Sequence, residues 1–469
     1  MSLKATIDEV CAATGAVRVS GQPNAEVVGV GTDTRALQPG ELFLALRGPN
    51  FDGNKFAEQA LAAGAGALLL RDDELGRSIQ TESAVLVHPN PLEALGALAA
   101  WHRTRLSAEV IAITGSSGKT TSKAIAAQLL GRLRQTSASP KSFNNAIGVP
   151  LSILSTPVDS EFLVLEFGTS SAGEIARLCR IAQPTTGMIT NIGSAHLAQL
   201  GSIEGVAREK GDLAEGLPDE GLLCVCAEDR FKDELRGRTT ARTLTYGLGS
   251  DADLVAHDPL YHPAGTSFRL TVRGGESFDV TSPLLGEHNV LNLLGVLTLA
   301  HGLGLDLSEV LAGVPDLTPQ AQRLERHDLE GVQLLDDTYN ANPDSARAAV
   351  RVLAGFHGFK RRVLVLGDML ELGDFAAELH FQVGLEAAKS GLDLVVAVGE
   401  LARAAAAGAL EGGLPPQRVK HFEDTDQAQA GLPELIEPGD VVLVKGSRGM
   451  HMEQVVVALL RKFGRKRGA

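Results

Sequence analysis

Runs of consecutive apolar residues, each followed by a glycine-rich or polar turn, recur along the second part of the chain. Residues 110–113, 162–167 and 186–192 are almost entirely apolar and show little alternation with polar positions. Strands of this kind are buried on both faces, as in a mostly parallel sheet that helices cover. After the first run, Ile125 and Leu129 have helical spacing, so we expect a strand, a turn and a helix in that order.

The alternation of strands and helices is plainest beyond residue 318. Four short apolar runs there predict strands, at residues 332–335, 363–366, 392–398 and 441–444. Asn342 and Pro343 have the residue types of a helix N-cap and a first helical position. The pattern predicts a doubly wound α/β domain, with ligands at the carboxyl ends of its strands.

A chain of 469 residues is too long to pack around a single hydrophobic core, so its length suggests about three domains. Residues 314–319 contain two prolines and predict a linker. We therefore expect a small α/β domain over residues 1–107, with a helix after Phe56. A central domain with a parallel or mixed sheet would follow over 108–317, and a Rossmann-like domain over 318–469.

Composition is that of an ordinary globular protein, with 44% hydrophobic and 21% charged residues. No apolar run approaches the roughly 20 residues of a membrane-spanning helix. The first 15 residues include acidic side chains and lack the long apolar stretch of a secretory signal. We expect a cytoplasmic protein without a membrane segment.

The net charge of −14 gives no reason to expect nucleic acid as a partner, so anionic substrates must be bound by local groups. The four scattered cysteines fit a reducing compartment better than a disulfide framework. Cys224 and Cys226 alternate as two residues on one face of a strand do; a metal site is the alternative.

The most informative motif lies between the first apolar run and its helix, at the turn predicted near residues 114–121. Backbone amides and the helix dipole at such a turn bind polyphosphate, Lys119 can reach the outer phosphates, and the Thr120 hydroxyl can bind Mg²⁺. The strict pattern has glycine five residues before Gly118, where this chain has Ile113, so the loop is a shorter variant. The alternative is a turn that two glycines merely shape. We expect ATP or GTP to contact Thr114, Gly115, Ser116, Ser117, Gly118, Lys119, Thr120 and Thr121.

Three further residues are candidates for metal chemistry. Glu166 is nearly the last residue of a buried strand, where a carboxylate serves a site or pairs with a surface arginine. His196 is a ligand or a turn histidine with satisfied hydrogen bonds. Lys210 lies on the apolar face of a predicted helix, where burial lowers its pKa and leaves an amine that can react with CO₂. Its alternative is a lysine whose head reaches solvent.

The third predicted domain has polar residues suited to an anionic substrate. Residues 336–345, 367–373 and 445–449 each follow a buried strand, so they should meet at one sheet edge. Helix capping explains Asn342 but neither Tyr339 nor Asn340. Lys445 and Arg448 can bind a carboxylate; the alternative is ordinary solvated loop charge.

These motifs together resemble the Mur ligases over nearly the whole chain. The matching segments are GSSGKTT, SFNNAIGVP, LEFGTSSAGEI, TNIGSAHL, GEHNVLN, DDTYNANPDSARAAV, VLGDMLELG and LVKGSRGMHMEQVV. The resemblance implies three domains and an ATP-dependent ligase that joins D-alanyl-D-alanine to UDP-N-acetylmuramoyl-tripeptide through an acyl phosphate. It places the reaction in cytoplasmic peptidoglycan precursor synthesis, with two Mg²⁺ ions. We expect a monomer.

The resemblance also implies roles for particular residues. Lys119, Lys210 and His196 would be catalytic, with Lys210 carbamylated, and Thr120, Glu166, His196 and Lys210 would hold metal. The nucleotide would further contact His288, Asn289, Asn292, Arg323 and Asp337. The UDP-sugar and peptide substrates would contact Thr34, Arg35, Phe51, Asp52, Gly53, Asn144, Asn145, Tyr339, Asn340, Asn342, Lys445 and Arg448.

Two departures from the family pattern stand out. Asn54 replaces a frequent histidine, and Gln322 replaces a usual glycine before Arg323, so the interdomain hinge could bend differently. Two rival functions remain: an amide ligase of the folylpolyglutamate or cyanophycin type, and a nucleotide-dependent switch that forms no bond. The long segment before the phosphate loop argues against the first, and Lys210 argues against the second.

Overall fold

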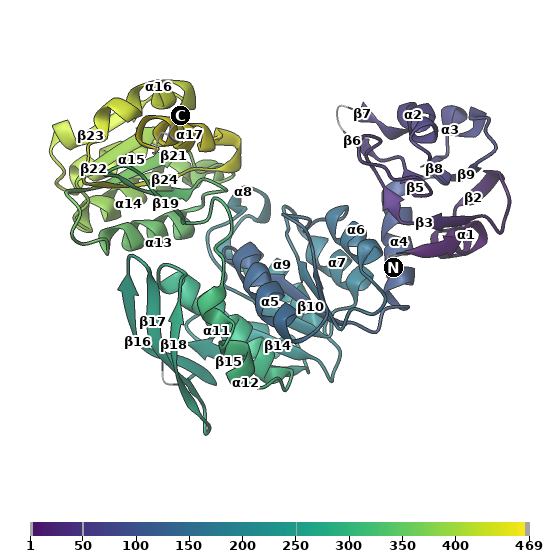
Figure 1. The fold of residues 1–469 in the computed structure, drawn as a ribbon, viewed down its shortest axis with the longest axis horizontal. Helices are drawn as coiled ribbons and strands as arrows, with labels where there is room; N and C mark the ends of the chain where they lie inside the picture. Colours follow the sequence, from purple (N-terminus) through teal and green to yellow (C-terminus); the bar gives the residue numbers. More distant parts are fainter. Residues whose placement is uncertain (1–2, 49–50, 250, 465–469) are drawn as a thin grey trace, which may run out of the picture.

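The computed structural model describes residues 3–48, 51–249 and 251–464. Three sheets divide the chain in sequence order, and Figure 1 shows the first and third at opposite ends of the molecule with the second between them. No helix among these residues is long and apolar enough to cross a membrane.

The first sheet has the strand order β2-β9-β8-β5-β4 and is parallel except for β2, which runs antiparallel to β9. Its strands are β2 (Val17–Ser20), β4 (Val30–Gly31), β5 (Leu42–Leu44), β8 (Ala67–Arg71) and β9 (Ala84–His88). Two strand pairs lie beside it, β1 (Lys4–Thr6) with β3 (Glu26–Val28) and β6 (Arg47–Gly48) with β7 (Phe51–Asp52). The helices are α1 (Ile7–Thr14), η1 (Gly53–Phe56), α2 (Ala57–Ala62), α3 (Glu74–Ser78) and α4 (Pro91–Arg103).

The central sheet has nine strands in the order β11-β12-β10-β13-β14-β15-β16-β17-β18. It is parallel from β11 to β16 and ends in an antiparallel hairpin layer. The parallel strands are β10 (Glu109–Thr114), β11 (Thr136–Ala138), β12 (Phe162–Glu166), β13 (Thr186–Ile189), β14 (Leu222–Cys226) and β15 (Arg242–Gly247). The others are β16 (Leu254–His262), β17 (Gly265–Val272) and β18 (Ser277–Ser282).

Helices connect these central strands, as the apolar runs predicted. They are α5 (Lys119–Leu133), α6 (Gly148–Ser155), α7 (Glu174–Ala182), α8 (Leu197–Leu200), α9 (Ile203–Glu215), α10 (Lys232–Gly237), α11 (Glu287–Gly302) and α12 (Leu307–Leu311). Cys224 and Cys226 are buried in the same apolar cluster, so their alternation is that of a strand. The linker predicted at residues 314–319 is in part a piece of the central unit. Val314 and Leu317, around the short helix η2 (Val314–Asp316), are buried in the central core.

The third sheet has the order β19-β20-β24-β21-β22-β23, parallel except for β19. Its strands are β19 (Glu325–Asp328), β20 (Gln333–Asp337), β21 (Arg361–Gly367), β22 (Leu394–Val398), β23 (Val419–Phe422) and β24 (Asp440–Lys445). The helices are α13 (Pro343–Ala354), η3 (Gly373–Phe375), α14 (Ala376–Lys389), α15 (Arg403–Glu411), η4 (Pro416–Arg418), α16 (Thr425–Leu435), η5 (Arg448–Met450) and α17 (Glu453–Phe463). Two apolar clusters cover the faces of this sheet, which is the predicted doubly wound arrangement.

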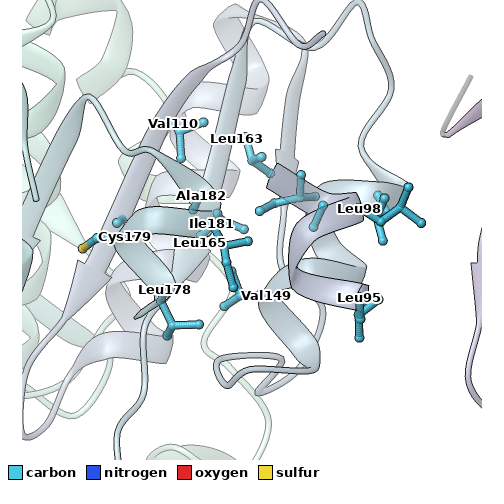
Figure 2. Packing of buried hydrophobic residues seen from close by; sticks show 14 of the residues in the cluster. Leu95, Leu98, Val110, Val149, Leu163, Leu165, Leu178, Cys179, Ile181 and Ala182 are labelled. Atoms are coloured by element: carbon cyan, nitrogen blue, oxygen red, sulfur yellow. The ribbon is translucent and has the colours of Figure 1, made fainter. Parts of the chain in front are cut away.

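The first two units share one hydrophobic core. A continuous buried cluster runs from Leu3 to Ala241, and α4 contributes Leu95 and Leu98 to it. Figure 2 shows these leucines beside Val149 of α6 and Ile181 of α7. The first unit is therefore packed against the central one through α4, whereas the third has separate cores.

Candidate active site

A cavity of about 670 Å³ lies between the central and third units. Most of the residues that the sequence singled out line it. They are Ser116, Ser117, Gly118, Lys119, Thr120, Thr121, Asn144, Asn145, Glu166, His196, His288, Asn289, Asn292, Arg323, Asp337, Tyr339, Asn340, Asn342, Lys445 and Arg448.

The turn between β10 and α5 forms the floor of this cavity. Gly115 and Gly118 have φ angles of 146° and 79°, which L-residues with side chains rarely adopt. A Cβ on Gly118 would lie 2.3 Å from Oδ1 of Asn292, so the Asn292 side chain on α11 would have to move to admit one. The Thr190 hydroxyl donates to the Ser117 carbonyl at 2.5 Å and ties the loop to the end of β13. These contacts leave a preformed turn at a helix N-terminus, which is a phosphate-binding geometry.

Lys119 folds back over the turn. Its Nζ donates to the Gly115 carbonyl at 2.6 Å and to the Ser116 carbonyl at 3.3 Å. Burial lowers the pKa of Lys119, Glu166 opposes that shift, and Arg323 adds to it. The ammonium is thus held by weak neutral acceptors, which anionic phosphate oxygens would replace favourably.

Glu166 has a partner that the sequence did not reveal. Its Oε2 lies 3.3 Å from Nζ of Lys123, a buried residue of α5, and its Oε1 accepts a hydrogen bond of 2.9 Å from Asn144. The expected alternative, a surface arginine, is therefore wrong. Lys123 could have been suspected from its spacing of four residues after Lys119, because that places both lysines on one side of the helix. Lys123 also donates to the Lys141 carbonyl.

His196 starts α8 with a φ of 57°, in the left-handed region. Its Nδ1 lies 2.8 Å from Oε2 of Glu371, which belongs to the loop after β21 in the third unit. Burial lowers the pKa of His196, the charges of Lys119 and Lys210 add to that shift, and Glu371 opposes it. His196 is therefore partnered across two units, a contact that sequence reasoning missed.

Lys210 is buried on α9 and exposes only 1% of its surface, so the alternative in which its head reaches solvent is wrong. Burial lowers its pKa well below the usual value, Lys119 adds to that shift, and Glu209 opposes it. Glu209 is itself buried and accepts hydrogen bonds from Thr169 and from the backbone amides of Gly173 and Ile175. Lys210 is not among the residues that line the cavity.

These side chains fit a divalent cation. Glu166 Oε2 is buried and accepts no hydrogen bond from any described residue, although the Lys123 ammonium lies 3.3 Å away, so a cation bound there would share this oxygen with Lys123. The Glu166 carboxylate and the Thr120 hydroxyl are oxygen donors of the kind that Mg²⁺ prefers, whereas the His196 imidazole is a less usual magnesium ligand. A neutral amine at Lys210 is also the form that reacts with CO₂, and its carbamate would add oxygen donors.

The start of the third unit reaches into this site. Arg323 donates a hydrogen bond of 2.9 Å to the Thr120 hydroxyl and lies over the Tyr339 ring, 4.3 Å from its centre. Gln322 has a φ of 60°, so the position that favours glycine in the resembling family is left-handed here too. Its carbonyl accepts a hydrogen bond of 3.1 Å from the Tyr339 amide.

The three loops of the third unit meet as predicted. Lys445 Nζ pairs with Asp337 at 2.6 Å and donates to the Asn340 carbonyl at 3.0 Å, while the Leu370 amide donates to Ser447 at 2.9 Å. Asn342 caps α13 through a hydrogen bond of 2.8 Å from the Ser345 amide, so its oxygen serves the helix.

The N-terminus of α13 also contacts the phosphate-binding side directly. The amide nitrogen of the Asn342 side chain lies 3.5 Å from the Ser116 carbonyl, at the limit of a hydrogen bond. The Ser194 backbone amide donates to Asp344 at 2.8 Å.

The other predicted nucleotide and substrate residues have local partners. Asn289 donates to the Leu285 carbonyl at 2.9 Å and Asn292 donates to Asn289 at 3.0 Å, so both amides are oriented. Burial lowers the pKa of His288 to about 4, and Lys445 and Arg351 add to that shift. Asn145 accepts hydrogen bonds from the Ile147 and Gly148 amides at the start of α6.

The predicted residues of the first unit lie outside this cavity. Arg35 is exposed and pairs with Asp33, Thr34 contacts Gln59, and Phe51 is exposed. Gly53 is buried, and a Cβ there would lie 2.4 Å from the Leu46 carbonyl oxygen.

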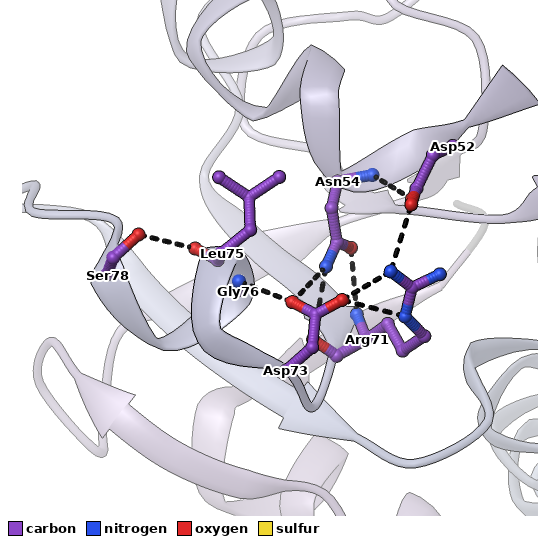
Figure 3. A network of polar contacts seen from close by, with 7 residues as sticks. All are labelled: Asp52, Asn54, Arg71, Asp73, Leu75, Gly76 and Ser78. Carbon is purple, nitrogen blue, oxygen red and sulfur yellow. Dashed lines mark hydrogen bonds and ion pairs between the residues drawn. The ribbon is translucent and has the colours of Figure 1, made fainter.

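Asn54, the departure from the family pattern, is fully integrated into the first unit. It exposes 2% of its surface, donates to Asp73 at 3.0 Å and accepts from the Arg71 amide at 2.9 Å (Figure 3). Arg71 in turn pairs with Asp52 at 2.9 Å. The asparagine therefore holds the segment that carries Asp52.

Comparison with known protein families covers all three units. Residues 26–103 match the catalytic domain of the Mur ligase family, residues 113–300 match the Mur ligase middle domain, and residues 322–448 match the glutamate ligase domain of Mur ligases.

Two curated relatives carry the name UDP-N-acetylmuramoyl-tripeptide–D-alanyl-D-alanine ligase. The Bacillus subtilis protein is 36% identical over 92% of this chain and 93% of its own. The Escherichia coli protein is 38% identical over the same shares. Among solved structures, MurF from Acinetobacter baumannii has a TM-score of 0.90 at 34% identity, covering 98% of this chain and 100% of that one. MurF from Thermotoga maritima in complex with ADP has a TM-score of 0.81 at 27% identity, covering 92% and 97%.

Proposed function

Because the chain belongs to the Mur ligase family, we propose that it is an ATP-dependent ligase that joins D-alanyl-D-alanine to UDP-N-acetylmuramoyl-tripeptide. The observation that carries this proposal is the shared cavity, in which the phosphate-binding turn of the central domain faces Tyr339, Lys445 and Arg448 of the third. The product is a precursor of peptidoglycan. We place the enzyme in the cytoplasm as a monomer.

The reaction needs activation because a carboxylate is a poor electrophile. An oxygen of the tripeptide's terminal carboxylate attacks the γ-phosphorus of ATP, and ADP leaves. The amine of D-alanyl-D-alanine then attacks the acyl carbon, and the tetrahedral intermediate expels inorganic phosphate, with loss of a proton from nitrogen. Catalysis of both steps is mainly positioning and neutralisation of charge.

The phosphate-binding turn orients the nucleotide. The amides of residues 115–121 face the triphosphate, and Lys119 leaves the Gly115 and Ser116 carbonyls to contact the γ-phosphate. His288, Asn289 and Asn292 bind the adenine end, where α11 lies against the turn. Arg323 and Asp337 contact the nucleotide from the third domain.

Thr120, Glu166, His196 and Lys210, the last as its carbamate, would hold two magnesium ions. When bound, these ions would supply neutralisation of the charge that develops on the transferred phosphoryl group. Burial lowers the pKa of Lys210 and so favours its neutral amine, whose nitrogen can bond to the carbon of CO₂ with release of a proton. Lys123, 3.3 Å from Oε2 of Glu166, balances part of the carboxylate's charge.

The peptide ends and the UDP end of the substrates are bound far apart. Asn144, Asn145, Tyr339, Asn340, Asn342, Lys445 and Arg448 line the cavity and serve the reacting peptides. Thr34, Arg35, Phe51, Asp52 and Gly53 serve the UDP-sugar in the first domain. This division assigns residues 1–107 to the UDP-sugar, 108–317 to ATP and 318–469 to the incoming dipeptide.

Release of inorganic phosphate tests this function. We expect release only when ATP, UDP-N-acetylmuramoyl-tripeptide and D-alanyl-D-alanine are all present, with one amide bond formed per phosphate. Tripeptides ending in lysine and in diaminopimelate should be compared, because either fits the chemistry described. Phosphate release with ATP alone would instead indicate a nucleotide-dependent switch, and acceptance of glutamate in place of the dipeptide would indicate a folylpolyglutamate-type ligase.

A further inference from the structure

We propose that Glu371 is a positioning residue that completes the metal site from the third domain. Its carboxylate would accept a hydrogen bond from Nδ1–H of His196, which keeps the proton on Nδ1 and leaves the Nε2 lone pair for a cation. This inference rests on the proposed function, because it takes His196 as a metal ligand.

The contact between His196 and Glu371 involves the Nδ1 atom of the imidazole. Oε2 of Glu371 lies 2.8 Å from the buried Nδ1 of His196. Nδ1 forms no hydrogen bond with the described residues as the ring stands, so a small rotation of the imidazole would let Nδ1–H donate to this carboxylate oxygen. His196 belongs to the central domain, at the start of α8, and lines the cavity. Glu371 belongs to the third domain, so a single side-chain pair spans the two bodies that enclose the reaction.

The loop that carries Glu371 is held firmly at both sides. The Met369 amide donates to Nε2 of the buried His380 at 2.8 Å, and the Leu370 amide donates to the Ser447 hydroxyl at 2.9 Å. On the other side, Leu372 is buried in the domain core. The carboxylate of Glu371 is therefore presented by a fixed backbone.

Both partners hold left-handed backbone conformations, with φ angles of 57° at His196 and 63° at Glu371. Residues other than glycine rarely adopt this region unless surrounding contacts maintain it, and such residues gather at functional sites. Two of them facing each other across an interdomain contact indicate that the geometry of this pair is maintained by the fold.

The chemistry of imidazole explains what the pair does. A neutral histidine carries one proton, so an acceptor at Nδ1 keeps the proton there and leaves the Nε2 lone pair free. Carboxylates commonly orient metal-binding histidines in this way, and their removal weakens metal affinity by about 10-fold to 100-fold. Because the carboxylate comes from the third domain, the cation site is complete only when that domain is in the position seen here. Cation binding and domain closure must then favour each other reciprocally.

The test compares Glu371→Ala, Glu371→Gln and the control Glu378→Gln, an exposed glutamate of α14 whose carboxylate accepts only from Gln382. Mn²⁺ binding is measured by electron paramagnetic resonance in the presence of ADP and the tripeptide, which requires no turnover. We expect about 10-fold weaker Mn²⁺ binding for Glu371→Ala, a smaller loss for Glu371→Gln, which keeps an acceptor, and none for Glu378→Gln. The Mg²⁺ concentration for half-maximal phosphate release should shift in parallel.

Repeating the measurement in a His196→Gln protein separates a positioning effect through His196 from a general disturbance of the fold. In a His196→Gln protein, Glu371→Ala should weaken Mn²⁺ binding no further, because Glu371 acts through His196. Wild-type Mn²⁺ affinity in Glu371→Ala, or an equal further loss in the His196→Gln background, would overturn the proposal. A wild-type protein that binds Mn²⁺ but releases no phosphate with both substrates would instead contradict the proposed ligase function.

Discussion

The Arg323 guanidinium joins the third domain to the phosphate-binding turn through its hydrogen bond to the Thr120 hydroxyl. The same group lies over the Tyr339 ring, so one side chain next to the interdomain linker contacts both sides of the cavity. Under the function proposed above, the Thr120 oxygen that accepts this hydrogen bond would also bind Mg²⁺. The Arg323 charge therefore already lies beside the place where the phosphates would bind.

Replacing Arg323 should impair catalysis more than folding. We expect Arg323→Ala to lower kcat/KM by about 100-fold, because a cation that faces the transferred phosphoryl group is lost. Arg326→Ala is the matched control, since Arg326 donates to the Pro263 carbonyl outside the cavity. Steady-state phosphate release measures both variants. Equal activity of the two would show that Arg323 has no catalytic part.

Lys210 should be needed for ligation and dispensable for nucleotide binding. We expect Lys210→Ala to abolish product formation while ADP still binds in a calorimetric titration, and added bicarbonate should not restore activity. A ¹³C signal from labelled CO₂ should be present in the wild-type protein and absent from the variant. Near-normal turnover of Lys210→Ala would exclude the carbamate.

The same lysine should shape the pH dependence of stability. Its folded-state pKa is lowered well below 10.5, so between that lowered value and about 10.5 the unfolded chain binds a proton that the folded protein lacks. This group therefore makes the free energy of unfolding rise with pH across that window, and Lys210→Met should remove the rise. Thermal unfolding in CO₂-free buffers measures it, with the exposed Lys389→Met as control. An unchanged slope in Lys210→Met would contradict the assignment.

Lys123 and Glu166 should be strongly coupled. Lys123→Met leaves the Glu166 carboxylate buried without its cation, which we expect to cost about 3 kcal/mol and to lower the unfolding midpoint. Adding Glu166→Gln should recover a large part of that loss, because the buried charge is then gone. Thermal unfolding of the two single variants and the double variant measures the coupling. Strictly additive losses would show that the two residues do not pair.

Gln322 should tolerate glycine well. Its φ of 60° costs a residue with a side chain about 1 kcal/mol, which glycine avoids, although glycine also gives the unfolded chain more freedom. We expect Gln322→Gly to leave the unfolding midpoint unchanged or raised, and Gln322→Val to lower it. Gln320→Gly, where φ is not positive, should be destabilising by about 0.5–1 kcal/mol. A clear loss for Gln322→Gly would refute the strain argument.

Local patterns were enough to predict three features. They are the mostly parallel sheets covered by helices, the glycine turn between a strand and a helix, and the convergence of three loops on one edge of the third sheet. These patterns work because continuous apolar strands, the Asn342 cap and the glycines of the turn act over a few residues. The family resemblance added roles that no spacing argument supplied, among them those of His288 and Arg323.

Contacts between residues far apart in the sequence lay beyond sequence reasoning. The pairs Lys123 with Glu166, Glu371 with His196 and Asp344 with Ser194 join residues 43, 175 and 150 positions apart. Each pair includes a charged side chain that, from the sequence alone, could equally be solvated at the surface or paired with another neighbour. Only the tertiary arrangement shows which partner it has. The shared core of the first two units was missed for the same reason, because the apolar positions of α4 do not specify which surface they cover.

The shared core couples the position of the first unit to that of the phosphate-binding turn. Because α4 packs against α6 and α7 in that core, rotating the first unit relative to the phosphate-binding turn would expose side chains of the shared cluster to water. Under the function proposed above, the sugar nucleotide and the triphosphate would then be bound at two places whose separation this core sets. A muramoyl peptide would have to span that separation for its terminal carboxylate to reach the phosphate-binding turn.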